Sequence, residues 1–260
     1  MRILFLGDIV GRSGRTAIKS HISDIRKEES VDIVFANGEN ASAGIGLSAK
    51  NARELLNTDI DGLTSGNHIW KFKNLYNVLE KEPRLLRPAN YPEGSPGTGV
   101  QIIEAEGLPP VALINLQGRT FMPPVDCPFQ VAERILSELP DDVRIRVVDF
   151  HAEATSEKIA MSYFLDGRVS AVVGTHTHVQ TNDARVLPKG TAYLTDLGMC
   201  GPENSCLGMK PEIIVEKFVT GLPKRFEVVK GPGVLQGAIF DIDDSTGAAI
   251  SIAPWQRNFS

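Results

Sequence analysis

The sequence has few cysteines and no long apolar run, and both shortages exclude classes of protein. Its three cysteines, Cys127, Cys200 and Cys206, are too few and odd in number for a disulfide framework, so we expect free thiols in a reducing compartment. The first apolar run, Ile3–Leu6, is too short for the core of a signal peptide. No other apolar stretch has the length needed to span a bilayer. We therefore expect a cytoplasmic protein that does not act at a membrane.

Basic residues are also in short supply. The chain of 260 residues has 27 lysines and arginines against 32 aspartates and glutamates, which leaves a formal net charge of -5. This balance argues against a broad surface for long nucleic acid. It does not argue against a small phosphate ligand, because bound metal ions outweigh the average surface charge locally.

Short apolar strands alternate with helical stretches along the chain. We expect strands over Arg2–Leu6, Val31–Ala36, Ile60–Thr64, Gly99–Ala105, Val111–Leu116, Ile145–Phe150, Ser170–Gly174, Ala192–Thr195, Arg225–Val229, Val234–Asp241 and Ala248–Ile252. We expect helices over Gly14–Glu28, from the cap Ser48 to Asn57, and over Lys73–Lys81, Pro128–Leu139, Ala154–Leu165 and Pro211–Val219. This pattern predicts an α/β fold with two sheets and helices outside, in a single domain over residues 1–260. We interpret Pro83–Pro96 as a crossing between the sheets.

Five of the expected strands end in polar residues that are able to bind metal. These residues are Asp8, then Glu39 and Asn40, then Asn67 and His68, then His151, and then His176 and His178. In α/β folds ligands bind beyond the carboxyl ends of the strands, so parallel neighbours would bring the five groups to one edge. Glycine precedes or lies close to most of them, and it permits the backbone to approach a ligand closely.

The histidines carry much of this signal. Only five are present, and four of them follow strands, whereas His21 falls within the first helix and is expected at the surface. A mixture of carboxylate, amide and imidazole ligands suits manganese, iron, zinc or cobalt better than calcium.

Each candidate also has an ordinary structural explanation. Asp8 could cap a turn, Glu39 could be a solvated carboxylate, and Asn40 and Asn67 could be turn residues. The histidines could be satisfied core residues, and His68 could orient a ligand without exchanging a proton. We favour metal ligation because the whole set converges.

Other polar residues near these strand ends stay undecided. Arg12 and Arg15 could touch substrate or start a helix, Glu153 and Lys158 could support ligands from behind, and Arg119 has no clear role. Two other classes of motif are absent. The glycines after the first strand match neither a dinucleotide-binding loop nor a Walker A loop, and no nucleophile elbow of a serine hydrolase is present.

Three motifs resemble those of the calcineurin-like metallophosphoesterases. Gly7-Asp8, Gly66-Asn67-His68 and His176-Thr177-His178 occur in that family's order. Asp8 departs from the usual pattern because no histidine follows two residues later, and Glu39 stands where the family has an aspartate. Both departures resemble the YmdB subfamily, as do the stretches Gly7–Arg12, Ala36–Ala41 and Asp149–Lys158.

The resemblance implies a four-layer fold of two packed mixed sheets flanked by helices. It also implies two metal ions, for which iron and manganese are favoured and zinc and cobalt are alternatives. Glu39 would bridge the two ions. Asp8, Asn40 and His178 would complete one ion's ligands, Asn67, His151 and His176 would complete the other's, and His68 would be the catalytic acid.

The resemblance further implies hydrolysis of 2′,3′- and 3′,5′-cyclic nucleotides by a hydroxide that bridges the metals, and a homo-oligomer. Two such ions clamp a phosphate ester and lower the pKa of bound water. The alternatives are a phosphatase or nuclease that uses the same centre, and a metal-containing regulatory module with weak turnover.

Overall fold

Two mixed sheets form the centre of the molecule in the computed structural model, which describes residues 1–259. The first sheet has the strand order β12 (Ala249–Phe259), β11 (Gly233–Ile242), β10 (Met199–Pro202), β1 (Arg2–Ile9), β2 (Ile33–Asn37) and β3 (Gly62–Thr64). Strands β10, β1, β2 and β3 run parallel, and β11 and β12 are antiparallel to their neighbours.

The second sheet has the order β4 (Val100–Ile103), β5 (Val111–Gln117), β6 (Ile145–His151), β7 (Ala171–Thr175), β9 (Ala192–Leu194) and β8 (Arg185–Val186). Its four central strands, β5, β6, β7 and β9, are parallel, and the edge strands β4 and β8 are antiparallel to them. Each sheet therefore presents a set of parallel carboxyl ends at one edge.

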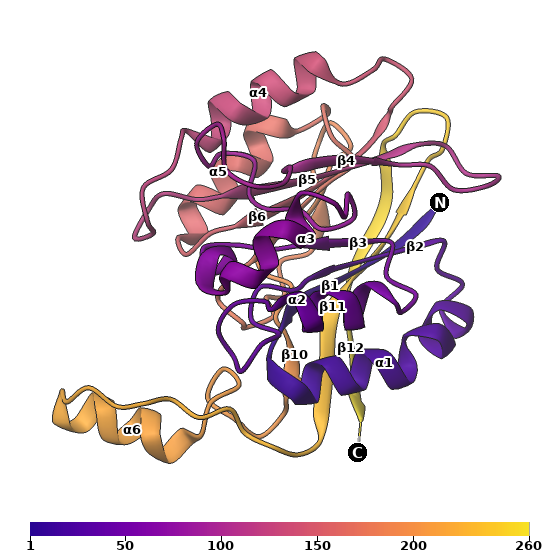
Figure 1. The fold of residues 1–260 in the computed structure, drawn as a ribbon. Helices are drawn as coiled ribbons and strands as arrows, with labels where there is room; N and C mark the ends of the chain where they lie inside the picture. The colour runs from indigo at the N-terminus through magenta and orange to yellow at the C-terminus, as the bar shows by residue number, and fades with distance from the viewer. Residues whose placement is uncertain (260) are drawn as a thin grey trace.

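Helices cover the outer face of each sheet (Figure 1). Helices α1 (Gly11–Glu28) and α2 (Ala49–Leu56) cover the first sheet, and α4 (Pro128–Glu138) and α5 (Thr155–Leu165) cover the second. The short α3 (Tyr76–Leu79) follows two 3₁₀ turns, and α6 (Pro211–Thr220) extends away from the layers. The predicted four-layer αββα fold is confirmed.

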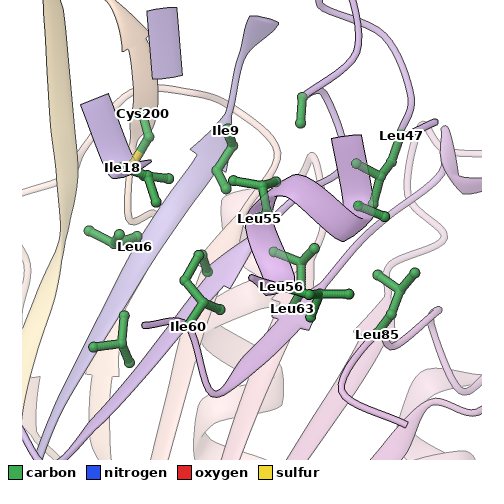
Figure 2. Close-up of a cluster of buried hydrophobic side chains, with 14 of the residues drawn as sticks. Leu6, Ile9, Ile18, Leu47, Leu55, Leu56, Ile60, Leu63, Leu85 and Cys200 are labelled. Carbon is green, nitrogen blue, oxygen red and sulfur yellow. The ribbon is translucent and has the colours of Figure 1, made fainter. Parts of the chain in front are cut away.

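Alternation along β1 explains how the layers pack. Ile3 and Phe5 lie in the core between the two sheets, whereas Leu4 and Leu6 lie in the core beneath α1 and α2. All four are fully buried, because a parallel strand in a layered fold is covered on both faces. Figure 2 shows the cluster beneath the helices, where Leu56 of α2 lies close to Leu63 of β3 and Leu55 of α2 lies close to Ile9 of β1.

Most predicted elements are confirmed within a few residues of their expected ends. Ser48 caps α2 as predicted, since its hydroxyl accepts a hydrogen bond from the backbone N–H of Asn51 at 3.4 Å. Pro83–Pro96 lies between β3 of the first sheet and β4 of the second, so its interpretation as a crossing is also confirmed.

The strand predicted over Arg225–Val229 is wrong. This segment has no neighbouring strand, and only Val228 forms an isolated bridge, to Met209. The helix predicted over Lys73–Lys81 is also too long, because it divides into a 3₁₀ turn at Lys73–Leu75 and the four residues of α3.

Two strands were not predicted. Strand β8 has only two residues, and β10 contains Gly201 and Pro202, which have low strand propensity. Strand β10 forms because tertiary structure places it between β1 and β11, so its pairing partners outweigh its composition.

Two expectations from composition can be compared with the structure. Cys200 is buried and Cys127 and Cys206 are partly buried, and all three are free thiols. Among residues 1–259, none of the helices combines the length and the apolar character that crossing a membrane requires.

Candidate metal centre

The polar residues that follow five strands meet where the carboxyl edges of the two sheets adjoin. Strands β1, β2 and β3 of the first sheet lead to one part of the set, and β6 and β7 of the second sheet lead to the rest. The side chains brought into mutual contact are Asp8, Glu39, Asn40, Asn67, His68, His151, His176 and His178. Each sequence-predicted site residue is therefore present in one cluster.

Asp8, Glu39 and His151 form the buried floor of this cluster. Their candidate ligand atoms all lie within 4.8 Å of one another, and all three side chains are fully buried. Within residues 1–259, Asp8 Oδ1 has no hydrogen-bond partner, and Glu39 Oε2 has none besides the ring nitrogen of His151, 2.5 Å away. A buried carboxylate oxygen without a partner is costly, and a bound cation would remove that cost. The residues present therefore fit a metal ion.

One half of the cluster gathers around His151. Its Nε2 lies 2.5 Å from Glu39 Oε2, 3.0 Å from His176 Nδ1 and 3.2 Å from Asn67 Oδ1. One carboxylate oxygen, one amide oxygen and two imidazole nitrogens thus point at a common place. This combination of donors suits a transition metal.

The other half gathers around Asp8. Its Oδ1 lies 3.8 Å from His178 Nε2, which in turn lies 3.1 Å from the side-chain amide nitrogen of Asn40. Its Oδ2 accepts a hydrogen bond from the backbone N–H of His176 at 2.9 Å. That bond fixes the carboxylate and leaves Oδ1 directed at the site.

Glu39 lies between the two halves, and His68 lies at the outer wall. Glu39 Oε1 is 2.9 Å from His68 Nδ1 and also accepts a hydrogen bond from the backbone N–H of His68 at 2.8 Å. His68 Nδ1 is 3.0 Å from Asn40 Oδ1. The side chain of His68 is 37% exposed, whereas Glu39 is fully buried, so His68 is the member of the pair that solvent reaches.

Backbone geometry makes this close approach possible. A Cβ atom on Gly66 would collide with Glu39 Oε2 and with the His151 ring, so only glycine fits there. His176 and His178 adopt φ angles of 103° and 64°, in the left-handed region that costs energy for a side chain larger than glycine. The surrounding structure must hold this turn in place.

A buried polar network behind His151 sets the direction of its ring. Thr175 Oγ1 donates to Asp149 Oδ1 at 2.7 Å, so the hydroxyl accepts from His151 Nδ1, which is 2.9 Å away. Thr64 and Asn37 donate to the other oxygen of Asp149 at 2.5 and 2.9 Å. The proton on Nδ1 leaves the lone pair of Nε2 directed at the site. The sequence analysis missed this network, although polar residues within apolar strands were a visible signal.

A buried ion pair supports the turn that carries His176 and His178. Lys158 Nζ lies 2.6 Å from Asp196 Oδ2, and both side chains are buried. The same oxygen accepts a hydrogen bond from the backbone N–H of Thr177 at 3.1 Å. Lys158, whose role the sequence left open, therefore supports the site indirectly, by holding Asp196 in place.

The other undecided residues divide between the site and the surface. Glu153 Oε2 lies 3.0 Å from His176 Nε2, on the side of the ring away from His151. Arg15 pairs with Glu54 at 3.2 Å and donates to the carbonyl of Ala41, so it braces the loop that carries Asn40. Arg12 and Arg119 have exposed side chains that make no ion pair within residues 1–259.

His21 differs from its predicted place at the surface. It is half-buried, and its ring stacks on Phe259 with the centroids 4.1 Å apart. The long C-terminal strand β12 extends past α1 and covers this histidine, a contact that the helical pattern alone does not reveal.

The charges of the cluster shift the pKa values of its members. Burial by itself lowers the pKa of His151, but the charges of Glu39 and Asp8 raise it to about 9. Burial and the charge of His151 lower the pKa of His176 to about 3. Burial also raises the pKa of Asp8. The site therefore holds two buried carboxylates beside one imidazole, and added positive charge would be favourable.

Comparisons with known proteins identify the family. The family model described as YmdB-like protein matches residues 4–255. The chain is 48% identical over 252 residues to the 2′,3′-cyclic-nucleotide 2′-phosphodiesterase of Bacillus subtilis, covering 97% of this chain and 95% of that protein. It is 36% identical to a putative phosphatase/phosphodiesterase of Mycoplasma genitalium, covering 97% and 91%.

Two solved structures have the same fold. A hypothetical protein from Thermus thermophilus superposes with a TM-score of 0.93 at 41% identity, over 100% of both chains. A novel phosphatase from Mycoplasma pneumoniae superposes with a TM-score of 0.93 at 35% identity, over 100% of this chain and 94% of that one. These matches confirm the resemblance that the motifs indicate, and the chain belongs to the YmdB-like family.

Proposed function

We propose that this protein is a phosphodiesterase with two metal ions that hydrolyses cyclic nucleotides, with 2′,3′-cyclic nucleotides as first substrates and 3′,5′-cyclic nucleotides as further ones. The observation that carries the proposal is the fully buried group of Asp8, Glu39 and His151, in which Asp8 Oδ1 has no hydrogen-bond partner within residues 1–259. The name of the Bacillus subtilis relative supports the substrate class.

The ligands divide into two sets that share Glu39. The proposed ligands are Asn67, His151 and His176 for one ion, and Asp8, Asn40 and His178 for the other. The separate groups of contacts around His151 and around Asp8 support this division. Iron and manganese are the proposed metals, with zinc and cobalt as alternatives. Two such ions would supply Lewis-acid chemistry, which polarises a phosphate ester and makes water a better nucleophile at neutral pH.

His68 is the proposed general acid. Its Nδ1 faces Glu39 and Asn40, and its Nε2 has no hydrogen-bond partner within residues 1–259. That nitrogen is therefore free to protonate the oxygen that leaves phosphorus. Expulsion of an alkoxide is slow without a proton, and general acid help contributes about 10²–10⁴-fold.

A phosphatase that acts on other phosphate esters is the second candidate, and it is supported by the names of the Mycoplasma relatives, which include phosphatase activity. A nuclease or a regulatory module with weak turnover would use the same residues. A single domain over residues 1–260, a cytoplasmic location and a homo-oligomer stay predictions.

The test is hydrolysis of 2′,3′-cyclic AMP by protein loaded with manganese or iron. Glu39→Gln and His68→Ala are assayed beside it, and metal is counted for each by elemental analysis. We expect two ions per wild-type chain, no turnover in Glu39→Gln, and a steep loss in His68→Ala with its metal retained.

Other outcomes would favour a different function for the protein. Full turnover in Glu39→Gln would contradict the metal mechanism. Two ions per chain with turnover only on phosphomonoesters or RNA would favour the phosphatase or the nuclease. Two ions with tight nucleotide binding and no turnover on any ester would favour the regulatory module.

A further inference from the structure

The loop over residues 118–122 follows β5 at the carboxyl edge of the second sheet. It lies beside the proposed metal centre, because β5 pairs with β6 and its last residue, Gln117, is the register partner of His151. The backbone N–H of Gly118 donates a hydrogen bond to the carbonyl oxygen of His151 at 3.0 Å. The loop is therefore joined to a residue whose imidazole faces the site.

Hydrogen bonds hold this loop in one shape. The carboxylate of Glu157, in the first turn of α5, accepts from the backbone N–H of Arg119 at 3.0 Å and from that of Thr120 at 3.2 Å. The backbone N–H of Met122 donates to the carbonyl oxygen of Arg119 at 3.3 Å, which closes the turn. A loop fixed in this way loses little conformational entropy when a ligand binds to it.

Phe121 is the residue that this loop presents to solvent. Its side chain is 91% exposed, more than any other large apolar side chain within residues 1–259. Its backbone φ angle is 61°, in the left-handed region that costs energy for a residue with a side chain. A phenylalanine here therefore adds nothing to the core and strains the backbone, which is the pattern of a residue retained for binding.

Two further aromatic residues connect His68 with the start of the loop. Trp70 lies two residues after His68, and its ring meets the ring of Tyr91 edge-on, with the centroids 5.3 Å apart. The hydroxyl of Tyr91 donates to Gln117 Oε1 at 3.0 Å. Burial, and after it the charge of Glu39, raise the pKa of Tyr91 to about 12, so its hydroxyl lies within electrostatic reach of the metal centre. Aromatic side chains thus extend from the proposed acid to the loop.

We propose that Phe121 binds the base of the substrate by stacking while the phosphate occupies the metal centre. This inference rests on the proposed function, which makes the substrate a nucleotide. The two ends of a nucleotide need different surfaces, because the phosphate is an anion and the base is a flat aromatic ring. The metal centre suits the first, and an exposed ring on the neighbouring strand's loop suits the second.

Stacking on an aromatic side chain is tolerant of sequence, because every base has a π face. The role of Phe121 therefore predicts a preference for nucleotides over phosphate esters without a base, and only a weak preference among bases. Purines should bind more tightly than pyrimidines, since their larger rings overlap more of the phenyl ring.

The first test compares the wild type, Phe121→Gly and Tyr163→Ala, each loaded with manganese. The substrates are 2′,3′-cyclic AMP and a methyl ribofuranoside 2′,3′-cyclic phosphate, which has no base. In Phe121→Gly we expect KM for the cyclic nucleotide to rise about 5–150-fold with kcat little changed, and the kinetics on the ester without a base to stay the same. Tyr163, 57% exposed on α5, is the control, and Tyr163→Ala should change neither.

The stability of Phe121→Gly distinguishes a binding role from a structural one. Glycine suits the left-handed backbone, so we expect a midpoint of thermal unfolding no lower than that of the wild type. A lower midpoint together with equal losses of turnover on both esters would make Phe121 a structural residue and overturn the proposal.

A binding measurement makes the test independent of turnover. In Phe121→Trp, stacking of adenine should quench the fluorescence of the new indole when 2′,3′-cyclic AMP is added. Phe121→Leu gives the background, since it keeps only the two native tryptophans, Trp70 and Trp255. Quenching without turnover on either ester would support the inference and contradict the proposed function. Turnover with an unchanged KM in Phe121→Gly and no quenching in Phe121→Trp would overturn the inference and leave the proposed function intact.

Discussion

The metal-binding edge of the sheets and the arm that carries α6, residues 203–232, differ in the kind of group that they leave without a partner. At the edge, polar atoms are buried among partners that come from strands far apart in the sequence, and the carboxylate oxygen Asp8 Oδ1 still lacks a partner within residues 1–259. On the arm, apolar side chains are exposed, and the contacts that shape it are local. An unpartnered buried charge calls for a cation, whereas an uncovered apolar stripe calls for another protein surface. The type of exposed or unpaired group therefore indicates the type of ligand.

The largest effect should come from Glu39→Gln, which removes the carboxylate shared by the two halves of the edge. We expect metal content to fall below that of the wild type and hydrolysis to fall below detection, because an amide offers neither the charge nor two equivalent oxygens. Elemental analysis and an assay on 2′,3′-cyclic AMP measure both. Glu138→Gln, at an exposed position on α4, is the control and should change neither.

His68→Ala distinguishes the residues that bind metal from the residue that donates the proton. We expect a rate about 10²–10⁴-fold lower, with metal content unchanged, because the imidazole is needed for proton transfer and not for the ions. Steady-state kinetics beside elemental analysis measure this. Loss of metal in step with loss of rate would make His68 a ligand instead.

Lys158→Met tests whether the buried support of the edge differs from the local contacts of the arm. The change leaves Asp196 charged and unpaired at a fully buried position, so we expect about 3–5 kcal/mol less free energy of unfolding. Lys224→Met removes an arm pair and should cost only about 0–1 kcal/mol. Urea denaturation measures both. Similar costs for the two variants would contradict this ranking.

The smallest expected effect is on metal affinity alone. Thr175→Val keeps the volume but removes the acceptor for His151 Nδ1, so we expect metal affinity to fall about 10–100-fold. Thr175→Ser keeps the hydroxyl and should bind metal nearly as well as the wild type. Competition with a chromogenic chelator measures these affinities. Equal losses in both variants would indicate that packing, and not the hydrogen bond, matters.

Much of the fold and the candidate set of site residues could be predicted because both depend on local pattern. The apolar run Ile3–Leu6 predicts a buried strand, and a polar residue such as Asp8 soon after it predicts a place at the sheet edge. The pattern failed where pairing decides the outcome. Strand β10 forms in spite of Gly201 and Pro202, and Arg225–Val229 stays irregular in spite of its composition, because only the first has neighbouring strands.

The sequence by itself determined most of the strands, their polar ends and the family, since these depend on residue order and on motifs within a few residues of one another. Only the tertiary structure decided that Asp149, Thr175 and Lys158 support the site, because their partners lie tens of residues away and meet only when the sheets pack. It also decided that Val215, Phe218 and Val219 of α6 stay exposed. Burial depends on which surfaces meet, and residue order alone does not specify those surfaces.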